Sequence, residues 1–429
     1  MELICTRDKQ SFDTFVESQV TIHYSKLWFW GEFESKHHTK TEYWRFVELG
    51  KTVATAVMLK KRTLLGSTWY IPNGPSLDYF DEELLKQVLE VIKREAIQAG
   101  ILYVRIDTNI PRRAHNQKGE ILEDGFNNEC ITDHFQSVGF NHTGYNYGYS
   151  GYLFPRFTFM LQLSSDFKDI IEQVVPNVRN LYRKNLRRGV EVRNGHRDEL
   201  IYLVKYGREL SEKLEFKPKP LKYFQLLFDL AKEHAVYRVA TADLGCAVKT
   251  IEEERETLLA SIINVESNPR KAGFVKEVRR QIEDLDNEEI DLKKLIQTNG
   301  NTIVLGAALY LLANDTAYNI YTYTNKDFPS FHTAISIHMD TIKEMKDRGI
   351  QHYDFVGVSG SVDPKDPYYG LYDFKRKFGG EYVEYLGEFY LKPRPKIANL
   401  QQRYSVFVWR IQRRLNAEII RLKAKLRNK

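Results

Sequence analysis

The sequence predicts an α/β protein in which one folding unit occurs twice, with a long helical hairpin inserted in the second copy. Two observations predict this architecture. Residues 41–107 and 301–357 repeat an order of strand, turn, strand, helix and strand. Residues 248–298, in contrast, carry apolar side chains at alternating spacings of three and four, as helices that pack side by side do. The length of 429 residues agrees with two or three domains.

The first copy consists of three strands, an amphipathic helix and a fourth strand, predicted at residues 41–49, 52–61, 67–74, 81–100 and 101–107. Gly50 and Lys51 make the turn between the first two strands. The helix has its apolar side chains on one face and ends at Gly100. The last strand is short and apolar, and it ends in the acidic residue Asp107.

The second copy consists of two strands, a helix and a final strand, predicted at residues 301–313, 316–325, 331–349 and 350–357. Asn314 and Asp315 make its turn, and Gly349 ends its helix. Its final strand carries Asp354, the counterpart of Asp107. Few letters are identical between the copies, so the duplication depends on the order of elements.

The inserted hairpin is predicted from its heptad-like spacing, which Pro269 and Gly273 divide into two helices. It contains 12 acidic and nine basic residues between Lys249 and Thr298, which indicates a solvated outer surface. The simplest interpretation is a rigid coiled-coil arm without chemistry of its own. The predicted units are a first domain, a second domain in two segments, the arm and a basic C-terminal helix, at residues 1–153, 154–247 with 299–395, 248–298 and 396–429.

Positive charge is concentrated in two places, although the whole chain carries only +6. Residues 397–429 contain nine Lys or Arg and one acid, Glu418, so the rest of the chain sums to about −2. The second place is a predicted helix with five basic side chains, Arg179, Arg183, Lys184, Arg187 and Arg188. Such patches indicate an anionic partner, either nucleic acid, a phosphate-bearing substrate or a membrane face, or else two solvated helix faces.

The location predicted from the sequence is the cytoplasm. The chain starts without a long apolar segment, and its longest uncharged apolar run, residues 303–313, is too short to span a bilayer. Three cysteines without a CxxC pair agree with a reducing compartment.

Common catalytic signatures are absent. Arg45 stands where a phosphate-binding loop before Lys51 requires glycine, and Ser361 ends a near match to a nucleophile elbow. The two copies resemble acetyltransferase domains, yet no glycine-rich turn suits the pyrophosphate of coenzyme A. We therefore expect no cofactor, and either a donor that is already activated or a site of an unfamiliar kind.

Several motifs in order resemble the Fem family of non-ribosomal peptidyltransferases. Residues 370–379 read GLYDFKRKFG, like the family's GLYxFKxxFG element, and residues 71–79 read IPNGPSLDY, like its IPRGPxxDY stretch. Residues 155–163, read PRFTFMLQL, precede a basic helix as the family's QPR strand does. The resemblance covers nearly the whole chain and includes the inserted hairpin.

The resemblance implies two tandem acetyltransferase-like domains and a specific reaction. An amine of the peptidoglycan stem peptide attacks the ester carbonyl of an aminoacyl-tRNA, on lipid II or on UDP-MurNAc-pentapeptide. Lys375 lies at the family's FK position and is the expected oxyanion stabiliser. Asp107 is expected either to orient the amine and accept its proton or to cap a turn, and Asp354 is expected to be structural.

The resemblance also implies precursor-binding residues. Tyr223 and Tyr321 match two binding tyrosines, whereas Lys219 stands in place of an arginine and cannot form a bidentate fork. Near the N-terminus Glu34 lies at the family's lysine position, and Lys36 is carried over as the phosphate-binding residue. The five basic residues from Arg179 to Arg188 are expected to contact tRNA phosphates.

The C-terminal helix combines many bases with apolar residues, Phe407, Trp409, Ile411, Leu415, Ile419 and Leu422. It is expected either to lie on the anionic inner leaflet of the membrane or to pack on the first domain and offer its bases to tRNA. Two other functions remain open at this point, an acyl-CoA N-acyltransferase of the acetyltransferase class and a non-enzymatic tRNA- or membrane-binding adaptor.

Overall fold

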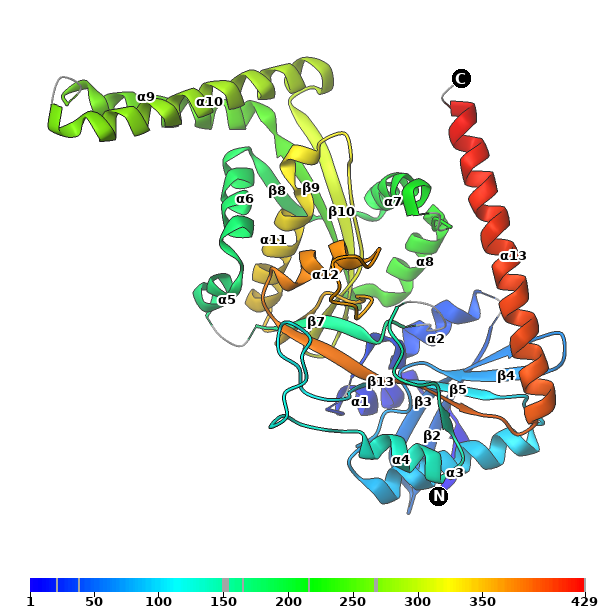
Figure 1. Ribbon diagram of the computed structural model, residues 1–429. Helices are drawn as coiled ribbons and strands as arrows, with labels where there is room; N and C mark the ends of the chain where they lie inside the picture. The colour runs from blue at the N-terminus through cyan, green and yellow to red at the C-terminus, as the bar shows by residue number, and fades with distance from the viewer. Residues whose placement is uncertain are drawn as a thin grey trace.

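The structure is a computed structural model that describes residues 1–20, 22–37, 39–148, 154–163, 166–214, 217–265 and 269–427. Its strands form one mixed sheet in the order β1-β2-β3-β4-β5-β13-β7-β12-β11-β10-β9-β8, with β6 paired to β13 (Figure 1). The first strands along the chain are β1 (Glu2–Cys5), β2 (Lys40–Glu48), β3 (Lys51–Arg62), β4 (Ser67–Ile71), β5 (Val104–Pro111) and β6 (Asn141–His142). The later strands are β7 (Phe157–Gln162), β8 (Val190–Asn194), β9 (Ala235–Asp243), β10 (Thr302–Ala313), β11 (Thr316–Thr324), β12 (His352–Asp354) and β13 (Glu381–Leu391). The predicted α/β class is confirmed.

Helices flank both halves of this sheet. Those in the first half are α1 (Lys9–Glu17), α2 (Trp28–Ser35), α3 (Glu82–Gln98) and α4 (Cys130–Ser137). Those in the second half are α5 (Phe167–Gln173), α6 (Pro176–Arg187), α7 (Ile201–Leu214), α8 (Leu221–Ala231), α11 (Thr333–Asp347) and α12 (Tyr369–Arg376). No helix in the described part of the chain combines the length and the apolar character needed to cross a membrane.

The two halves repeat the same path of the chain. In the first, β2, β3 and β4 pair antiparallel in turn, and α3 leads to β5, which runs parallel to β4. In the second, β9, β10 and β11 do the same, and α11 leads to β12, parallel to β11. The sequence indicated only two strands before the second helix. It missed β9 because the hairpin separates this strand from β10.

One strand joins the halves into a continuous sheet. The N-terminal part of β13 pairs with β7, and its C-terminal part pairs with β5. β13 therefore belongs to both halves, although it follows the second half in sequence. The division of the chain into domains predicted above remains a prediction.

A separate hydrophobic core lies where the halves meet. Phe12, Phe29 and Phe33 of α1 and α2 pack in one cluster with side chains of α8 and β10, among them Phe224 and Leu309. All five side chains are buried. This apolar contact fixes the two halves against each other and therefore fixes the geometry between them.

The hairpin consists of α9 (Leu244–Ile263) and α10 (Ala272–Asn299), which lie side by side and project from the second half (Figure 1). Ile262, Val275 and Val278 form a small apolar cluster along their seam. At the base, Glu288 of α10 pairs with the buried Arg188 after α6. Whether the seam follows coiled-coil packing remains a prediction.

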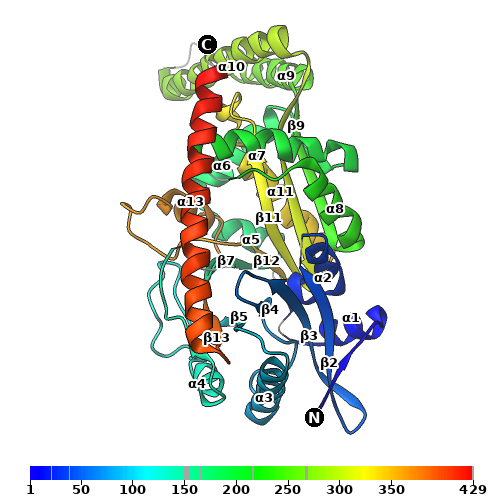
Figure 2. The ribbon, with the colours of Figure 1, turned by 90° about the vertical axis from the view of Figure 1, so that its right-hand side faces the viewer.

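α13 (Pro395–Arg427) follows β13 and stands along one side of the molecule (Figures 1 and 2). Its first turns rest on the first half, where Ala398 and Gln401 are buried. The Gln401 side-chain oxygen accepts a hydrogen bond from the Leu65 amide at 3.2 Å. The side chains of Trp409, Ile419 and Leu422, named above, lie outside those described.

Candidate active site

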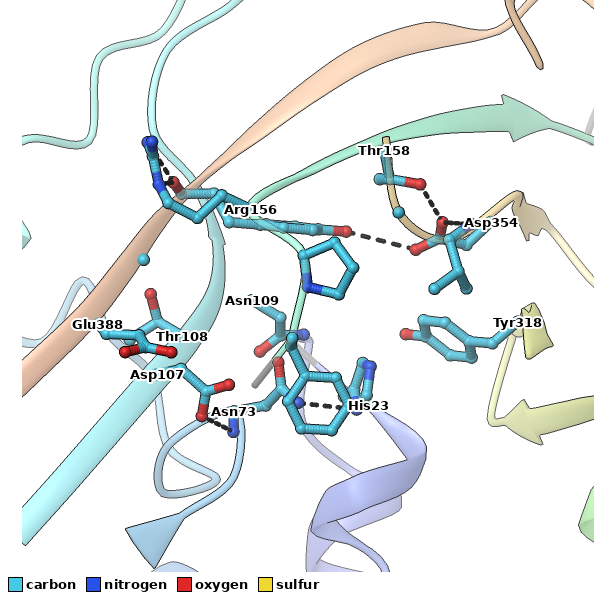
Figure 3. Close-up of a pocket in the computed structure, with 16 residues that line it drawn as sticks. His23, Asn73, Asp107, Thr108, Asn109, Arg156, Thr158, Tyr318, Asp354 and Glu388 are labelled. Atoms are coloured by element: carbon cyan, nitrogen blue, oxygen red, sulfur yellow. Dashed lines mark hydrogen bonds between the residues drawn. The ribbon is translucent and has the colours of Figure 1, made fainter. Parts of the chain in front are cut away.

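A small cavity lies between the two halves, and each half contributes an aspartate to its wall. Asp107 comes from β5 and Asp354 from the end of β12, and Figure 3 shows them on opposite sides of the cavity. Both side chains are 3% exposed. The cavity volume is about 30 Å³, the space of one or two water molecules. Only the reacting groups of a substrate fit there.

Asp107 is held by the loop after β4. Its Oδ1 accepts a hydrogen bond from the Asn73 amide at 2.8 Å, and its Oδ2 accepts one from the Tyr70 hydroxyl at 3.1 Å. Glu388 of β13 is its cross-strand neighbour. Burial and the negative charge of Glu388 raise the pKa of Asp107 to about 7. This carboxyl group is thus poised to exchange a proton near neutral pH.

Asp354 is held more tightly. Its Oδ1 accepts hydrogen bonds from the Thr158 hydroxyl and, at 2.7 Å, from the Val356 amide, while the Tyr385 hydroxyl approaches Oδ2 at 3.4 Å. Burial raises the pKa of Asp354, and these donors oppose the rise. The arrangement agrees with the structural role expected for this residue.

Lys375 is buried behind the loop that follows Asp354. Its ammonium donates to the Val356 carbonyl and, at 2.8 Å, to the Gly357 carbonyl. Val356 adopts a φ of 49°, which is rare and strained for a β-branched residue. Lys375 therefore holds a strained loop whose residues line the cavity. Burial lowers the pKa of Lys375 to about 7.

Lys26 is a buried lysine of the first half that also lies behind a loop at the cavity, and sequence reasoning missed it. It is 2% exposed, its Nζ lies 3.4 Å from the Pro75 carbonyl, and the same loop contains Asn73 at a φ of 54°. Burial lowers the pKa of Lys26 to about 7, opposed by the negative charge of Asp107. A lysine directly before the apolar run LWFW was the available signal.

Two polar atoms on the cavity wall lack a hydrogen-bond partner among the described residues. They are the Thr108 Oγ1 and the Asn109 Oδ1, which directly follow Asp107 on β5. Buried polar atoms are normally paired, so these two indicate a place for a polar ligand group. Three consecutive polar residues in a buried strand were a signal that the sequence offered.

A larger hollow of about 490 Å³ adjoins the cavity and shares Asn109, Tyr318 and Tyr385 with it. Both halves line this hollow, with Arg113 and His115 on one side and His352 on the other. It is large enough to hold part of a substrate whose reacting groups enter the cavity. Among the described residues, no group of three His, Cys, Asp or Glu side chains is arranged to hold a metal ion.

Three of the four predicted precursor-binding residues, Lys219, Tyr223 and Tyr321, come together near the contact between α2 and α8. The Lys219 Nζ lies 4.4 Å from the centre of the Tyr223 ring, and the Tyr223 and Tyr321 hydroxyls are 3.0 Å apart. Lys36 is exposed at the end of α2, next to His37, whose ring lies 5.6 Å from that of Tyr223. Residues 215–216 of this motif lie outside the described residues.

The structure gives different surroundings to the five basic residues, four of which lie on α6 and the fifth directly after it. Arg188 is buried, pairs with Glu288 at 2.6 Å and donates to the Ser330 carbonyl at 3.1 Å. The expectation that it contacts tRNA is corrected, because its charge anchors the hairpin. Lys184 and Arg187 lie 3.8 Å and 3.6 Å from Glu288, and Arg187 also lies 3.6 Å from Glu254. Arg183 is exposed, and Arg179 is half-buried.

Comparisons with known proteins agree with this architecture. The chain is similar to the aminoacyltransferase FemA of Staphylococcus aureus strain MRSA252, at 25% identity over 339 residues, which are 76% of this chain and 79% of FemA. FemA of strain N315 matches to the same extent. The crystal structure of FemX superposes with a TM-score of 0.77 at 22% identity, covering 94% of this chain and 100% of FemX.

That superposition shows a shared fold. The family itself is shown by a match to the FemAB family model over residues 8–404, which include the cavity and both of its aspartates. The chain belongs to the FemAB family.

Proposed function

We propose that this FemAB-family enzyme transfers an amino acid from an aminoacyl-tRNA to the stem-peptide amine of a peptidoglycan precursor and thereby builds the interpeptide bridge. The observation that carries the proposal is Asp107, a buried carboxyl group beside unpaired polar atoms in a cavity between the halves. The acceptor is lipid II or UDP-MurNAc-pentapeptide. The reaction belongs on the cytoplasmic side of the membrane, and the enzyme contacts the inner leaflet peripherally.

The first chemical step is attack of the amine on the ester carbonyl. In water a lysine-type amine has a pKa of about 10.4, so it must lose a proton to become nucleophilic. This first proton goes to water, and Asp107 accepts a second proton from the nitrogen as the nitrogen–carbon bond forms. Thr108 Oγ1 and Asn109 Oδ1 supply the hydrogen-bond acceptors that orient the amine beside it.

The second step is collapse of the tetrahedral intermediate. The bond from the carbonyl carbon to the ribose oxygen of the tRNA breaks, and the proton held by Asp107 passes to that oxygen. The positive charge of Lys375, one layer behind the Val356–Gly357 loop, stabilises the developing oxyanion across the loop. The ester is activated before it is bound, so the step needs no cofactor.

We assign the Lys219, Tyr223 and Tyr321 cluster, with Lys36, to the diphosphate and sugar of the precursor. Lys219, Tyr223 and Tyr321 belong to the second half, and His37 of the first half, next to Lys36, lies beside Tyr223. Arg179, Arg183, Lys184 and Arg187 are assigned to tRNA phosphates, with the affinity falling steeply as salt rises.

The test mixes the purified protein with a panel of radiolabelled aminoacyl-tRNAs and each precursor form, and measures labelled amide product. Transfer from one or two tRNAs that is lost in Lys375→Ala supports the proposal and identifies the amino acid. No transfer from any tRNA, together with acylation of an amine by acetyl-CoA, overturns it.

A further inference from the structure

α13 exposes a continuous apolar face after its first turns. Leu400, Tyr404, Phe407, Ile411 and Leu415 follow spacings of four, three, four and four, so they lie on one side of the helix. Their exposed fractions are 59%, 45%, 61%, 41% and 52%. Helical side chains at this spacing are normally buried against a partner. This face is therefore built to contact something outside the described chain.

Positive charge accompanies the apolar face. Arg403 and Arg410 are exposed on the same helix. Residues 397–429 contain nine bases and the single acid Glu418. A basic helix with an apolar face of this kind is typical of segments that lie in the interface of an anionic bilayer.

The charge also decides between two occupants of this face. Pairing with α13 of a second copy would place a net charge of +8 against another +8 along the same seam. Like charges beside a helical seam oppose association. Anionic lipid headgroups, in contrast, attract each base. We propose that the apolar face of α13 binds an anionic phospholipid bilayer surface.

The position of α13 connects this surface to the precursor site. α13 stands on the same side of the molecule as α2 and α8 (Figure 1), and Figure 2, which looks onto that side, shows all three helices. Lys36 follows α2, and Lys219 and Tyr223 lie at the start of α8. A bilayer bound to α13 would adjoin the side of the molecule that carries these helices. Given the proposed function, which this step assumes, the acceptor is the lipid-linked precursor.

The first experiment measures binding of the full-length protein to vesicles by flotation, without any substrate. Wild type is expected to float with phosphatidylcholine vesicles that contain phosphatidylglycerol, and at least tenfold more weakly with pure phosphatidylcholine. The variant F407S/I411S is expected to lose most of this binding. Val406→Ser is the matched control, because Val406 is 48% exposed on another face of the same helix. R403Q/R410Q is expected to weaken binding to the anionic vesicles.

Equal flotation of F407S/I411S and wild type overturns the proposal. So does a wild-type dimer in light scattering that becomes monomeric in F407S/I411S while neither form binds vesicles, since a second copy then covers the face. Circular dichroism of the variant checks that the helix has formed.

A second experiment separates this proposal from the proposed function. Transfer is compared between precursor embedded in anionic vesicles and a water-soluble short-chain analogue. The ratio of the two rates is expected to fall at least tenfold in F407S/I411S and to stay unchanged in Val406→Ser. Absence of transfer to any acceptor, with vesicle binding intact, refutes the proposed function and leaves the bilayer surface standing. An unchanged ratio refutes the link to a lipid-linked acceptor.

Discussion

Asp107 and Asp354 lie on corresponding strands of the two halves, β5 and β12, yet their surroundings give them different chemistry. Asp354 accepts from a threonine hydroxyl, a backbone amide and a tyrosine hydroxyl. Asp107 accepts from one amide and one tyrosine, and it faces a second carboxylate, Glu388. Donors stabilise a carboxylate and a neighbouring negative charge destabilises it, so Asp107 is the better proton acceptor near neutral pH. Each half of the duplicated fold therefore contains an aspartate at the cavity, and the neighbouring groups determine whether that aspartate can accept a proton.

The largest expected effect is a difference in the rate constant of transfer between substitutions of the two aspartates. Asp107→Asn is expected to lower the rate constant of transfer about 10²- to 10⁴-fold, because the amide cannot accept the amine proton. Asp354→Asn is expected to lower it about tenfold or less, because the amide oxygen still accepts from Val356. Single-turnover transfer measures both rates, and thermal melts check folding. Equal losses in the two variants would show that both aspartates act in proton transfer.

Substitutions of the two buried lysines, Lys375 and Lys26, are also expected to lower the rate of transfer to different extents. Lys375→Met is expected to lower transfer about 10²- to 10³-fold, the usual effect of removing a stabiliser of an oxyanion. Lys26→Met is expected to cost about tenfold, because Lys26 supports the Asn73–Pro75 loop from behind. Steady-state kinetics of both variants provide the measurement. A larger loss in Lys26→Met than in Lys375→Met would reverse the assignment of the oxyanion side.

Arg156 is a buried residue near Asp354 that is expected to stabilise the folded protein. Its side chain is 2% exposed, pairs with Glu384 and donates to the carbonyl of Tyr385, the residue whose hydroxyl reaches Asp354. Arg156→Met is expected to lower the free energy of unfolding by about 3 kcal/mol, because the buried Glu384 loses a partner. The control Arg193→Met removes a more exposed pair and is expected to cost about 1 kcal/mol or less. Urea denaturation measures both, and similar values would contradict the structural role of Arg156.

The smallest effect is a shift in pH dependence. Asp107 has a raised pKa of about 7, so it is protonated and unable to accept a proton below that pH. The rate of transfer is therefore expected to rise with pH through about 7. Glu388→Gln removes the neighbouring negative charge, lowers the pKa of Asp107 and moves this rise to lower pH. The pH–rate profiles of both proteins give the midpoints. An unmoved midpoint would assign the rise to a group other than Asp107.

Local patterns were sufficient for much of the fold. Apolar spacing, turns and helix ends predicted the order of most strands and helices, the hairpin inserted in the second copy and the position of Asp107 on a buried strand. Each of these signals arises within a few residues of the chain. β9 was missed because the hairpin, residues 244–299, separates it from the strand it pairs with.

The site shows the same limit. Lys219, Tyr223 and Tyr321 were named from motifs, and the structure brings them together. Arg188 was named from its basic neighbours, yet it is buried against Glu288, 100 positions further along the chain. Lys26 carried only a weak local signal, because its role depends on the distant Pro75 loop.

The sequence by itself determined the α/β class, the duplication, the membership of a family and an aspartate on the last strand of each copy. The predicted end of the first of these strands at Asp107 was wrong, because β5 continues to Pro111. Tertiary structure alone decided that β13 joins both halves, that the two aspartates face one cavity, and that only Asp107 has a carboxylate opposite it. The physical reason is how far apart in the chain the interacting residues lie. Helix and strand patterns express interactions between neighbours in the chain, whereas burial and the charge near a carboxyl group come from residues hundreds of positions away.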